Sequence, residues 1–172
     1  MARIWIFACG RADNNEWEKM WPEWLRERHI TVGCNSPQNL DLSVGRTMEE
    51  IKRAVNDGKN GRQAPILYTF AYNIKDGDYI VVRKGFGHVL GIGRVQGNIP
   101  PPAANTAWEP GNHYQIRTVN WLYASKTPQP LANKNSFNRR ATIQDTGINA
   151  IDPNDFPRSL QLGDNPRYDN HL

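Results

Sequence analysis

The sequence has very little cysteine and no long hydrophobic run. Its 172 residues include two cysteines, Cys9 and Cys34, which are too few for a disulfide framework and favour free thiols in a cytoplasmic setting. No apolar run approaches the ~18 to 20 residues of a membrane-spanning helix, so no membrane partner is expected. The first residues lead directly into a short strand-like segment, without the apolar stretch and cleavage site of a signal peptide.

Motifs for catalysis and for cofactor binding are also missing. The histidines are scattered, and their spacing to the two cysteines fits no zinc site. The glycines of residues 85–87 and 91–93 lie inside an expected hairpin and not at a strand-to-helix turn, so the pattern does not support a phosphate-binding glycine loop. The sequence therefore predicts a binding domain that is not an enzyme and has no catalytic residue, no metal and no cofactor.

Basic residues outnumber acidic ones by a modest margin. The chain has 21 Lys and Arg against 17 Asp and Glu, a net charge of +4, which fits either a polyanionic partner or an ordinary soluble protein. The basic residues flank the expected strands, at Arg83, Lys84, Arg94, Arg117, Lys126, Lys134, Arg139 and Arg140. This placement favours phosphate contacts along one rim formed by these residues. The expected phosphate ligands on it are Arg83, Lys84, Arg94, Arg139 and Arg140.

The clearest local signal is a hairpin in the middle of the chain. Asp76-Gly77-Asp78 supplies a turn, and the β-branched and aromatic residues 79–82 follow it as a strand. The returning strand, to about residue 97, contains Gly91 and Gly93, which indicate a bulge or a close backbone approach.

Other elements are predicted from periodicity and capping signals. Strands are expected at residues 3–8, 30–34 and 114–122, with a short apolar segment at 142–151 and a loop at 126–138. An amphipathic helix is expected at about 16–28 with Asp13 or Asn14 as its cap, and a second helix starts at the capping box of Thr47 and Glu50. Residues 65–72 fit a helix or a strand, and we favour a short helix.

This set of elements predicts one α+β domain over residues 1–152. Five or six short strands with two or three inserted helices favour a mixed, curved sheet that tends toward a barrel. Residues 153–172 have few apolar side chains and are expected to form a polar tail or a linker.

Six tryptophans are present, and they differ in their expected roles. Trp5 and Trp121 lie in strands, and Trp21 and Trp24 share the apolar helix face, so these four are expected in the core. Trp17 lies at the edge of that face. Trp108, in a long loop without apolar periodicity, either covers the end of the barrel or stacks on a base.

Several short motifs occur in a fixed order over residues 2–151: Trp5, Trp21 and Trp24, then segments 30–33, 41–43, 74–78, 91–97 and 117–122. This order resembles the EVE-like members of the PUA/EVE/YTH superfamily, which occur at the N-terminus of some McrB-type and other modification-dependent restriction proteins. The resemblance implies a PUA-like pseudo-barrel that flips a modified base into an aromatic pocket.

The resemblance also implies where that pocket lies. Three loops build it, and the expected pocket residues are Cys9, Gly10, Asp13, Asn14, Asn15, Trp17, Gly33, Cys34, Asn35, Ser36 and Trp108. Many relatives have a tryptophan directly after the glycine that ends the second strand, where this chain has Cys34. One wall of the cage is therefore missing or is replaced by Trp17, Tyr72 or Phe86.

The polar residues of these loops allow two interpretations. Asp13, Asn14, Asn15, Asn35 and Ser36 either read a base edge or serve as caps and turns.

We interpret the chain as a recognition module for a modified base in DNA, acting with other domains or subunits of a restriction system. One alternative is an RNA reader of YTH or PUA type that binds a methylated base in single-stranded RNA. A third is a stand-alone nucleic-acid-processing enzyme, for which Asp41, Glu50 and Lys52 would supply the acidic-and-lysine pattern of many nucleases. The sequence leaves open which base is read.

Overall fold

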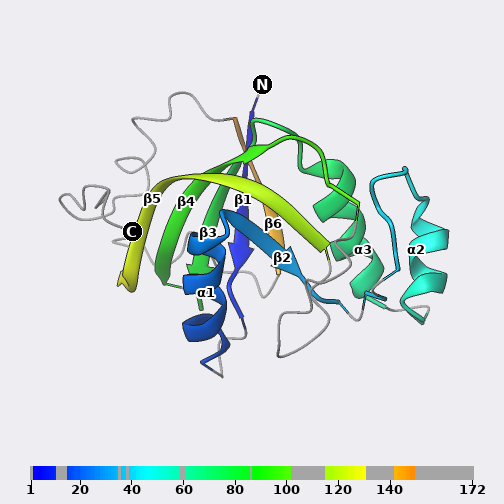
Figure 1. The fold of residues 1–172 in the computed structure, drawn as a ribbon, viewed down its shortest axis with the longest axis horizontal. Helices are drawn as coiled ribbons and strands as arrows, with labels where there is room; N and C mark the ends of the chain where they lie inside the picture. Colours follow the sequence, from blue (N-terminus) through cyan, green and yellow to red (C-terminus); the bar gives the residue numbers. More distant parts are fainter. Residues whose placement is uncertain are drawn as a thin grey trace.

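The computed structural model describes residues 2–10, 15–34, 36–37, 39–58, 61–85, 87–101, 115–130 and 142–149. Their elements, in chain order, are β1 (Arg3–Ala8), α1 (Glu16–Arg26), β2 (His29–Val32), α2 (Met48–Ala54), α3 (Gln63–Tyr68), the π-helix η1 (Thr69–Asn73), β3 (Tyr79–Lys84), β4 (His88–Gln96), β5 (Gln115–Pro130) and β6 (Ile143–Asn149). The strands form one sheet in the order β2-β5-β4-β3-β1-β6 (Figure 1).

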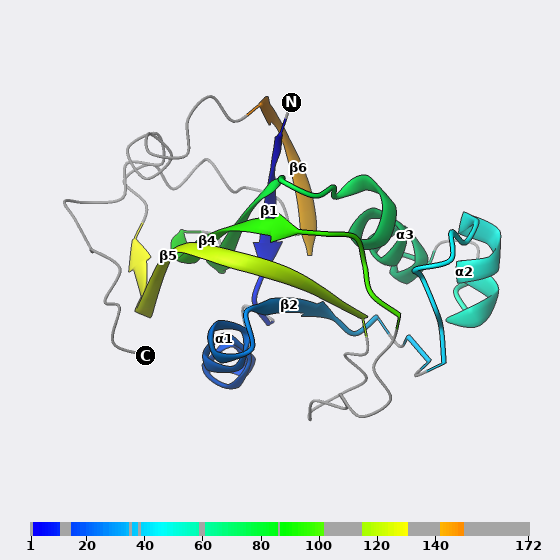
Figure 2. The same ribbon diagram turned by 45° about the horizontal axis from the view of Figure 1, so that its top comes forward.

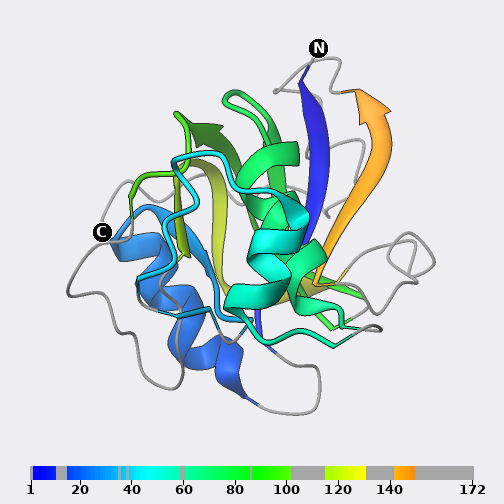
Figure 3. The same cartoon turned by 90° about the vertical axis from the view of Figure 1, so that its right-hand side faces the viewer.

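The sheet is mixed and curved, which confirms the expected α+β class. β1 and β3 are parallel, whereas the other neighbouring strands are antiparallel. The long strand β5 bends across the molecule, with α1 near one part of the sheet and α2 and α3 together near another (Figure 2). β1 and β6 lie side by side at the sheet edge that Figure 3 shows. No helix in the described ranges has the length and apolar character needed to cross a bilayer.

Two local expectations were wrong. Residues 126–130, expected in a loop, continue β5, because β4 extends far enough to pair His88 with Pro130. Among the described residues, β5 has a partner strand on only one side there. Such an edge position tolerates proline because no ladder hydrogen bond is lost. At α1, Asn15 occupies the N-cap position without a side-chain cap bond, in place of Asp13 or Asn14.

The core lies on both faces of β1, because alternate side chains of a strand point to opposite sides. Trp5 and Phe7 join the larger apolar cluster, whereas Ile4 and Ile6 join a second one on the other face. The four tryptophans expected in the core are buried there: Trp5, Trp21, Trp24 and Trp121.

The glycines of β4 serve both purposes that the sequence indicated. The pairing of β4 with β5 shifts register between Val89 and Gly91 and again between Ile92 and Gly93. A Cβ atom at Gly91 would lie 2.3 Å from the Trp21 ring. Glycine is therefore required where the buried indole packs directly against the backbone.

One buried histidine makes the stability depend on pH. His29 is 9% exposed, and its Nε2 lies 3.9 Å from Glu23 Oε1. Burial lowers the pKa of His29 below the ordinary 6.5, Glu27 opposes this shift and Arg26 adds to it. Between the lowered pKa of the folded state and the ordinary 6.5, the unfolded chain carries a proton on this imidazole and the folded chain does not. The free energy of unfolding therefore decreases as the pH falls below 6.5.

We expect the urea midpoint to fall between about pH 7.5 and about pH 5.5, and the fall to be smaller in a His29→Gln variant. Burial raises the pKa of Glu23, which gives a slope of the opposite sign, so the comparison with His29→Gln isolates the histidine. His88→Gln, at an exposed position of β4, is the matched control. An unchanged pH dependence in His29→Gln would assign the effect to other groups.

Candidate functional site

The carboxyl ends of the parallel strands β1 and β3 meet at the end of the sheet where α1 begins (Figure 1). Ala8 pairs with Arg83, and the Cys9 amide donates a 3.0 Å hydrogen bond to the Arg83 carbonyl. The loop after the first strand, where the resemblance places part of the pocket, therefore starts beside the end of β3.

An aromatic ring and a cation meet at this place. The Lys84 ammonium lies 4.3 Å from the centroid of the Trp17 ring, in cation–π contact. Both side chains are half-buried. Trp17 Nε1 is buried and has no hydrogen-bond partner among the described residues. We call Gly10, Trp17 and Lys84 the carboxyl-end site.

Gly10 brings the chain close to the first turn of α1. Its φ is +71°, and a Cβ atom there would lie 2.9 Å from Glu16 Cβ and 3.0 Å from the Trp17 amide nitrogen. Because other residues rarely adopt this φ and would clash here, glycine is needed to position α1. Trp17 is thereby placed next to Lys84.

The two cysteine thiols are neutral. Burial raises the pKa of Cys9, and the Glu16 carboxylate adds to the shift. Burial likewise raises the pKa of Cys34 to about 11, with Asp57 adding to it. Thiolate is the reactive form of cysteine, so neither thiol is suited to nucleophilic chemistry at neutral pH.

The end of β2 provides a second part of the expected pocket. Cys34 is half-buried with a φ of +50°, and the Ser36 amide donates to the Gly33 carbonyl at 2.9 Å. Ser36 is fully buried, where its hydroxyl accepts a 3.0 Å hydrogen bond from Gln115 Nε2. Ser36 thus anchors the loop to β5, and its burial leaves it unable to reach a base edge.

Two of the basic residues expected along the rim are buried in the described part of the chain. Arg83 is 4% exposed, and its Nη1 donates to the Gly85 carbonyl. Arg117 is 1% exposed and donates to the carbonyls of Phe70, Ala71 and Gly97. Both arginines are therefore left out of the proposed phosphate contacts.

Arg94 and Lys84 lie at opposite ends of the hairpin. Arg94 pairs with Tyr79, the first residue of β3, whereas Lys84 is its last. Five residues along a strand correspond to about 17 Å. Lys84 alone, of the phosphate ligands expected in the described ranges, belongs to the carboxyl-end site.

Other expected site residues remain predictions. Asn15 is exposed at the start of α1. Six lie outside the described residues: Asp13, Asn14, Asn35, Trp108, Arg139 and Arg140. Of the replacements considered for the missing cage wall, Phe86 lies outside them too, whereas Tyr72 lies on η1, where its hydroxyl donates to the Leu42 carbonyl at 2.8 Å.

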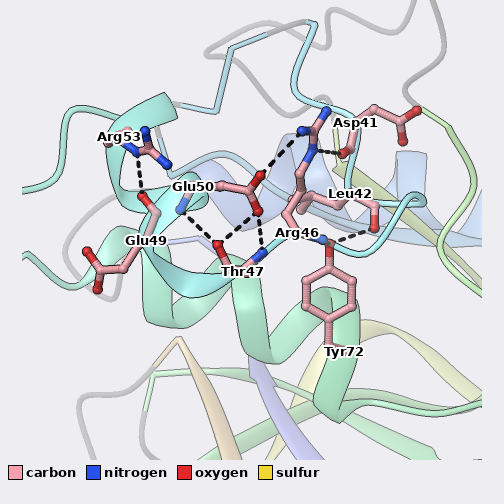
Figure 4. A network of polar contacts seen from close by, with 8 residues as sticks. All are labelled: Asp41, Leu42, Arg46, Thr47, Glu49, Glu50, Arg53 and Tyr72. Atoms are coloured by element: carbon pink, nitrogen blue, oxygen red, sulfur yellow. Dashed lines mark hydrogen bonds and ion pairs between the residues drawn. The ribbon is translucent and has the colours of Figure 1, made fainter.

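The acidic residues of the nuclease alternative make structural contacts, and Figure 4 shows those of Glu50 with Thr47. Glu50 accepts 2.7 Å and 2.8 Å hydrogen bonds from the amide and hydroxyl of Thr47, which completes the expected capping box of α2. Asp41 accepts from the amide and hydroxyl of Ser43, and Lys52 Nζ donates to Glu49. The described ranges hold no cluster of His, Cys, Asp and Glu suited to a metal ion.

The contact between Trp17 and Lys84 was not predicted. The two residues are far apart in sequence, and only the parallel pairing of β1 with β3 brings them together. A signal was present, since Trp17 and Lys84 each lie at an element boundary. A mixed sheet was expected, but not that the first strand pairs in parallel with the strand at residues 79–84, so this signal was not used.

Comparison with known proteins gives one family match and several similar folds. Residues 5–146 match the family described as Domain of unknown function (DUF8426). Two solved structures are complexes of the YTH domain of Mmi1 with RNA, at 13% and 14% identity and TM-scores of 0.39 and 0.38. A third is the YTH domain of MRB1 from Zygosaccharomyces rouxii in complex with N6-methyladenosine RNA, at 12% identity and a TM-score of 0.41.

The extent of these matches differs. The alignments to Mmi1 cover 72% and 77% of this chain and 57% of each Mmi1 chain, so the protein spans little more than half of their length. The alignment to MRB1 covers 84% of this chain and 78% of that one. Among curated proteins, no similar sequence is found.

Proposed function

The chain belongs to the DUF8426 family of domains of unknown function, and we propose that it binds nucleic acid and holds a modified base at the carboxyl-end site. The observation that carries the proposal is the half-buried Trp17 ring under the Lys84 ammonium, at the strand ends where the resemblance to EVE and YTH readers places the pocket. An indole face suits base stacking, and an ammonium suits the adjoining phosphate.

The geometry suggests how one nucleotide is held. A base extruded from its stack lies against the Trp17 ring and displaces Lys84 from it. The ammonium then pairs with a phosphate of the same strand. The neutral Cys34 thiol, in place of the tryptophan of many relatives, leaves more room for a bulky base.

DNA and RNA remain two candidate polymers within this proposal. In the DNA version the domain directs a restriction nuclease carried elsewhere in the protein or on a partner. In the RNA version it reads a methylated base in a single strand, as the resemblance to YTH readers suggests. The carboxyl-end site is common to both, since stacking and phosphate pairing use groups that the two polymers share.

A binding screen separates the candidates. Duplex and single-stranded DNA and RNA of one sequence are compared with a plain base, N6-methyladenine, 5-methylcytosine, 5-hydroxymethylcytosine or a glucosylated base at the same position. We expect one modified oligonucleotide to bind more tightly than its plain counterpart at physiological salt, where non-specific binding is weakened. Equal affinity for modified and plain oligonucleotides in every arm would contradict the proposal.

Two substitutions test the site itself. With the preferred oligonucleotide, Trp17→Ala is expected to cost about 1 to 3 kcal/mol of binding free energy. The affinity for the modified oligonucleotide should fall more than the affinity for its plain counterpart. Lys84→Gln is expected to weaken modified and plain oligonucleotides alike and to reduce the salt slope by about one unit. Fluorescence anisotropy at several salt concentrations measures both effects.

The control is Lys52→Gln, since Lys52 lies on α2 and its Nζ already pairs with Glu49 at 2.8 Å. This variant should bind like the unmodified protein. Thermal melts of every variant show whether the fold is retained. Full binding by a folded Trp17→Ala variant would remove Trp17 from the site.

A further inference from the structure

A hollow lies at the end of the sheet opposite the carboxyl-end site, where β1 and β3 begin. Its volume is about 830 Å³, within the range of small-molecule sites. Residues from β1, η1, the turn before β3, and the strands β4 and β6 line it, among them Arg3, Asn73, Lys75, Asp76, Arg94 and Asp145. We call it the amino-end hollow.

The turn at residues 75–78, which lines the hollow, is held by several hydrogen bonds. The Asp78 amide donates to the Lys75 carbonyl at 3.1 Å, and Gly77 has a φ of +83°. The Gly77 amide donates to the Val95 carbonyl at 2.9 Å, and the Val95 amide donates to the Asp78 carbonyl at 2.8 Å. The turn is thereby tied to β4 and provides a preorganised surface.

Two cationic side chains line the hollow beside this turn, Lys75 and Arg94 of β4. Arg94 Nε donates to the Gly77 carbonyl at 3.2 Å, and a Cβ atom at Gly77 would lie 3.2 Å from Arg94 Nη2. The guanidinium thus lies against the turn. Lys75 is exposed. The Lys75 ammonium and both terminal Arg94 nitrogens have no hydrogen-bond partner in the described part of the chain, so their donors are available to a ligand.

The carboxylates around the hollow already have partners. Asp78 accepts from the Arg3 amide, Trp5 Nε1 and the Lys75 amide. Asp76 accepts from the Gly97 amide at 2.7 Å, and Asp145 pairs with Arg3 at 3.1 Å. Lys75 and the terminal nitrogens of Arg94, by contrast, keep cationic donors without a partner in the described residues, and such donors favour an anionic ligand.

We propose that the amino-end hollow binds a small phosphorylated molecule of nucleotide size, with its phosphate between Lys75 and Arg94. The volume fits a nucleotide. The carboxylates of Asp76 and Asp145 line the same hollow, and their charge opposes the successive phosphates of a polymer, which favours a small molecule with one phosphate over a nucleic-acid strand.

This site is separate from the carboxyl-end site and does not depend on its function. About 17 Å of strand separates Arg94 from Lys84. A nucleotide in the hollow would contact neither Trp17 nor Lys84.

Calorimetric titration of the whole chain with adenosine 5′-monophosphate, and with inorganic phosphate, tests the proposal. We expect saturable binding of one nucleotide per chain. The double variant Lys75→Gln and Arg94→Gln should weaken it by about tenfold or more. Lys84→Gln, at the other end of the hairpin, should leave it unchanged. Failure of both probes to saturate at millimolar concentration would overturn the proposal.

Two further measurements sharpen the test. Asp76→Asn keeps an acceptor for the Gly97 amide but removes a negative charge, so it should tighten nucleotide binding; weaker binding in a variant that melts normally would contradict the assignment. A saturating oligonucleotide should leave the nucleotide affinity unchanged. Displacement of the nucleotide by the oligonucleotide, or its loss in Lys84→Gln, would place it at the carboxyl-end site instead.

Discussion

Replacing Asp78 by alanine is expected to lower the free energy of unfolding by about 3 to 5 kcal/mol. The carboxylate is 3% exposed and accepts hydrogen bonds of 2.9 Å from the Arg3 amide, 2.8 Å from Trp5 Nε1 and 2.9 Å from the Lys75 amide. Truncation leaves three donors without an acceptor, and the indole donor is buried. Urea unfolding monitored by tryptophan fluorescence measures the loss.

Arg117 adds to this effect. Burial lowers the pKa of Arg117, and the carboxylates of Asp78 and Asp76 oppose that shift. Without Asp78, the buried Arg117 guanidinium loses part of the negative charge that offsets the cost of its burial.

Asp76→Ala is the matched control for Asp78→Ala, two positions away in the same turn. Asp76 is exposed and accepts one hydrogen bond, from the Gly97 amide, so its loss should cost about 1 kcal/mol. Equal effects of the two substitutions would show that the three contacts of Asp78 contribute nothing beyond those of a surface turn residue.

Gly91→Ala is expected to cost about 3 kcal/mol although it adds a single methyl group. The new Cβ would lie 2.3 Å from Trp21 Cη2 and 3.0 Å from the Tyr123 carbonyl oxygen. Trp21 is 1% exposed, its Nε1 donates to the Ser125 carbonyl at 2.7 Å, and its ring packs edge-on against Trp121. The indole therefore has no free space into which it could move.

Gly58→Ala is the control for this substitution. A Cβ atom at Gly58 meets nothing within 4 Å, so the change in stability should stay within about 1 kcal/mol of zero. Thermal and urea unfolding of both variants give the comparison. A Gly91→Ala variant as stable as Gly58→Ala would mean that the strand and the indole adjust without strain.

Local chemistry predicted much of the fold. The turn at Asp76-Gly77-Asp78, the glycines of β4 and the capping box at Thr47 each depend on residues close together in sequence, and the structure has all three. The favoured helix at residues 65–72 is also present, as α3 and η1. Such features follow from turn and packing rules that need no knowledge of distant partners.

The positions of the basic side chains were predicted less well, because they depend on which strands pair and in which register. Arg83 and Arg117 were expected on a rim, yet both are buried. For Arg117 a signal existed, since alternation along β5 puts it on the same face as the buried Val119 and Trp121. The prediction gave more weight to the charge of Arg117 than to the alternation along β5. The carbonyls that accept from Arg117 belong to η1 and to Gly97, directly after β4, and no local pattern links these segments to β5.

The separation of Arg94 from Lys84 follows from strand pairing as well. Both residues flank the same hairpin, which made one rim a natural expectation. The register pairs Arg94 with Tyr79 and Lys84 with His88. The two cations therefore belong to two different sites, and the amino-end hollow could not be predicted without that register.

The place of β1 in the sheet has a consequence for how the chain is made. β1 precedes the other strands of the described sheet in the chain, yet it pairs with β3 and β6. Its contacts join residues 73 positions apart, Trp5 with Asp78, and 142 apart, Arg3 with Asp145. Synthesis proceeds at about 5 to 20 residues per second. Many seconds therefore pass between the synthesis of the apolar residues 4–7 of β1 and the synthesis of their partner strand β6. Until β6 emerges from the ribosome, the nascent chain presents an unpaired apolar edge, the type of surface on which strands of neighbouring chains associate.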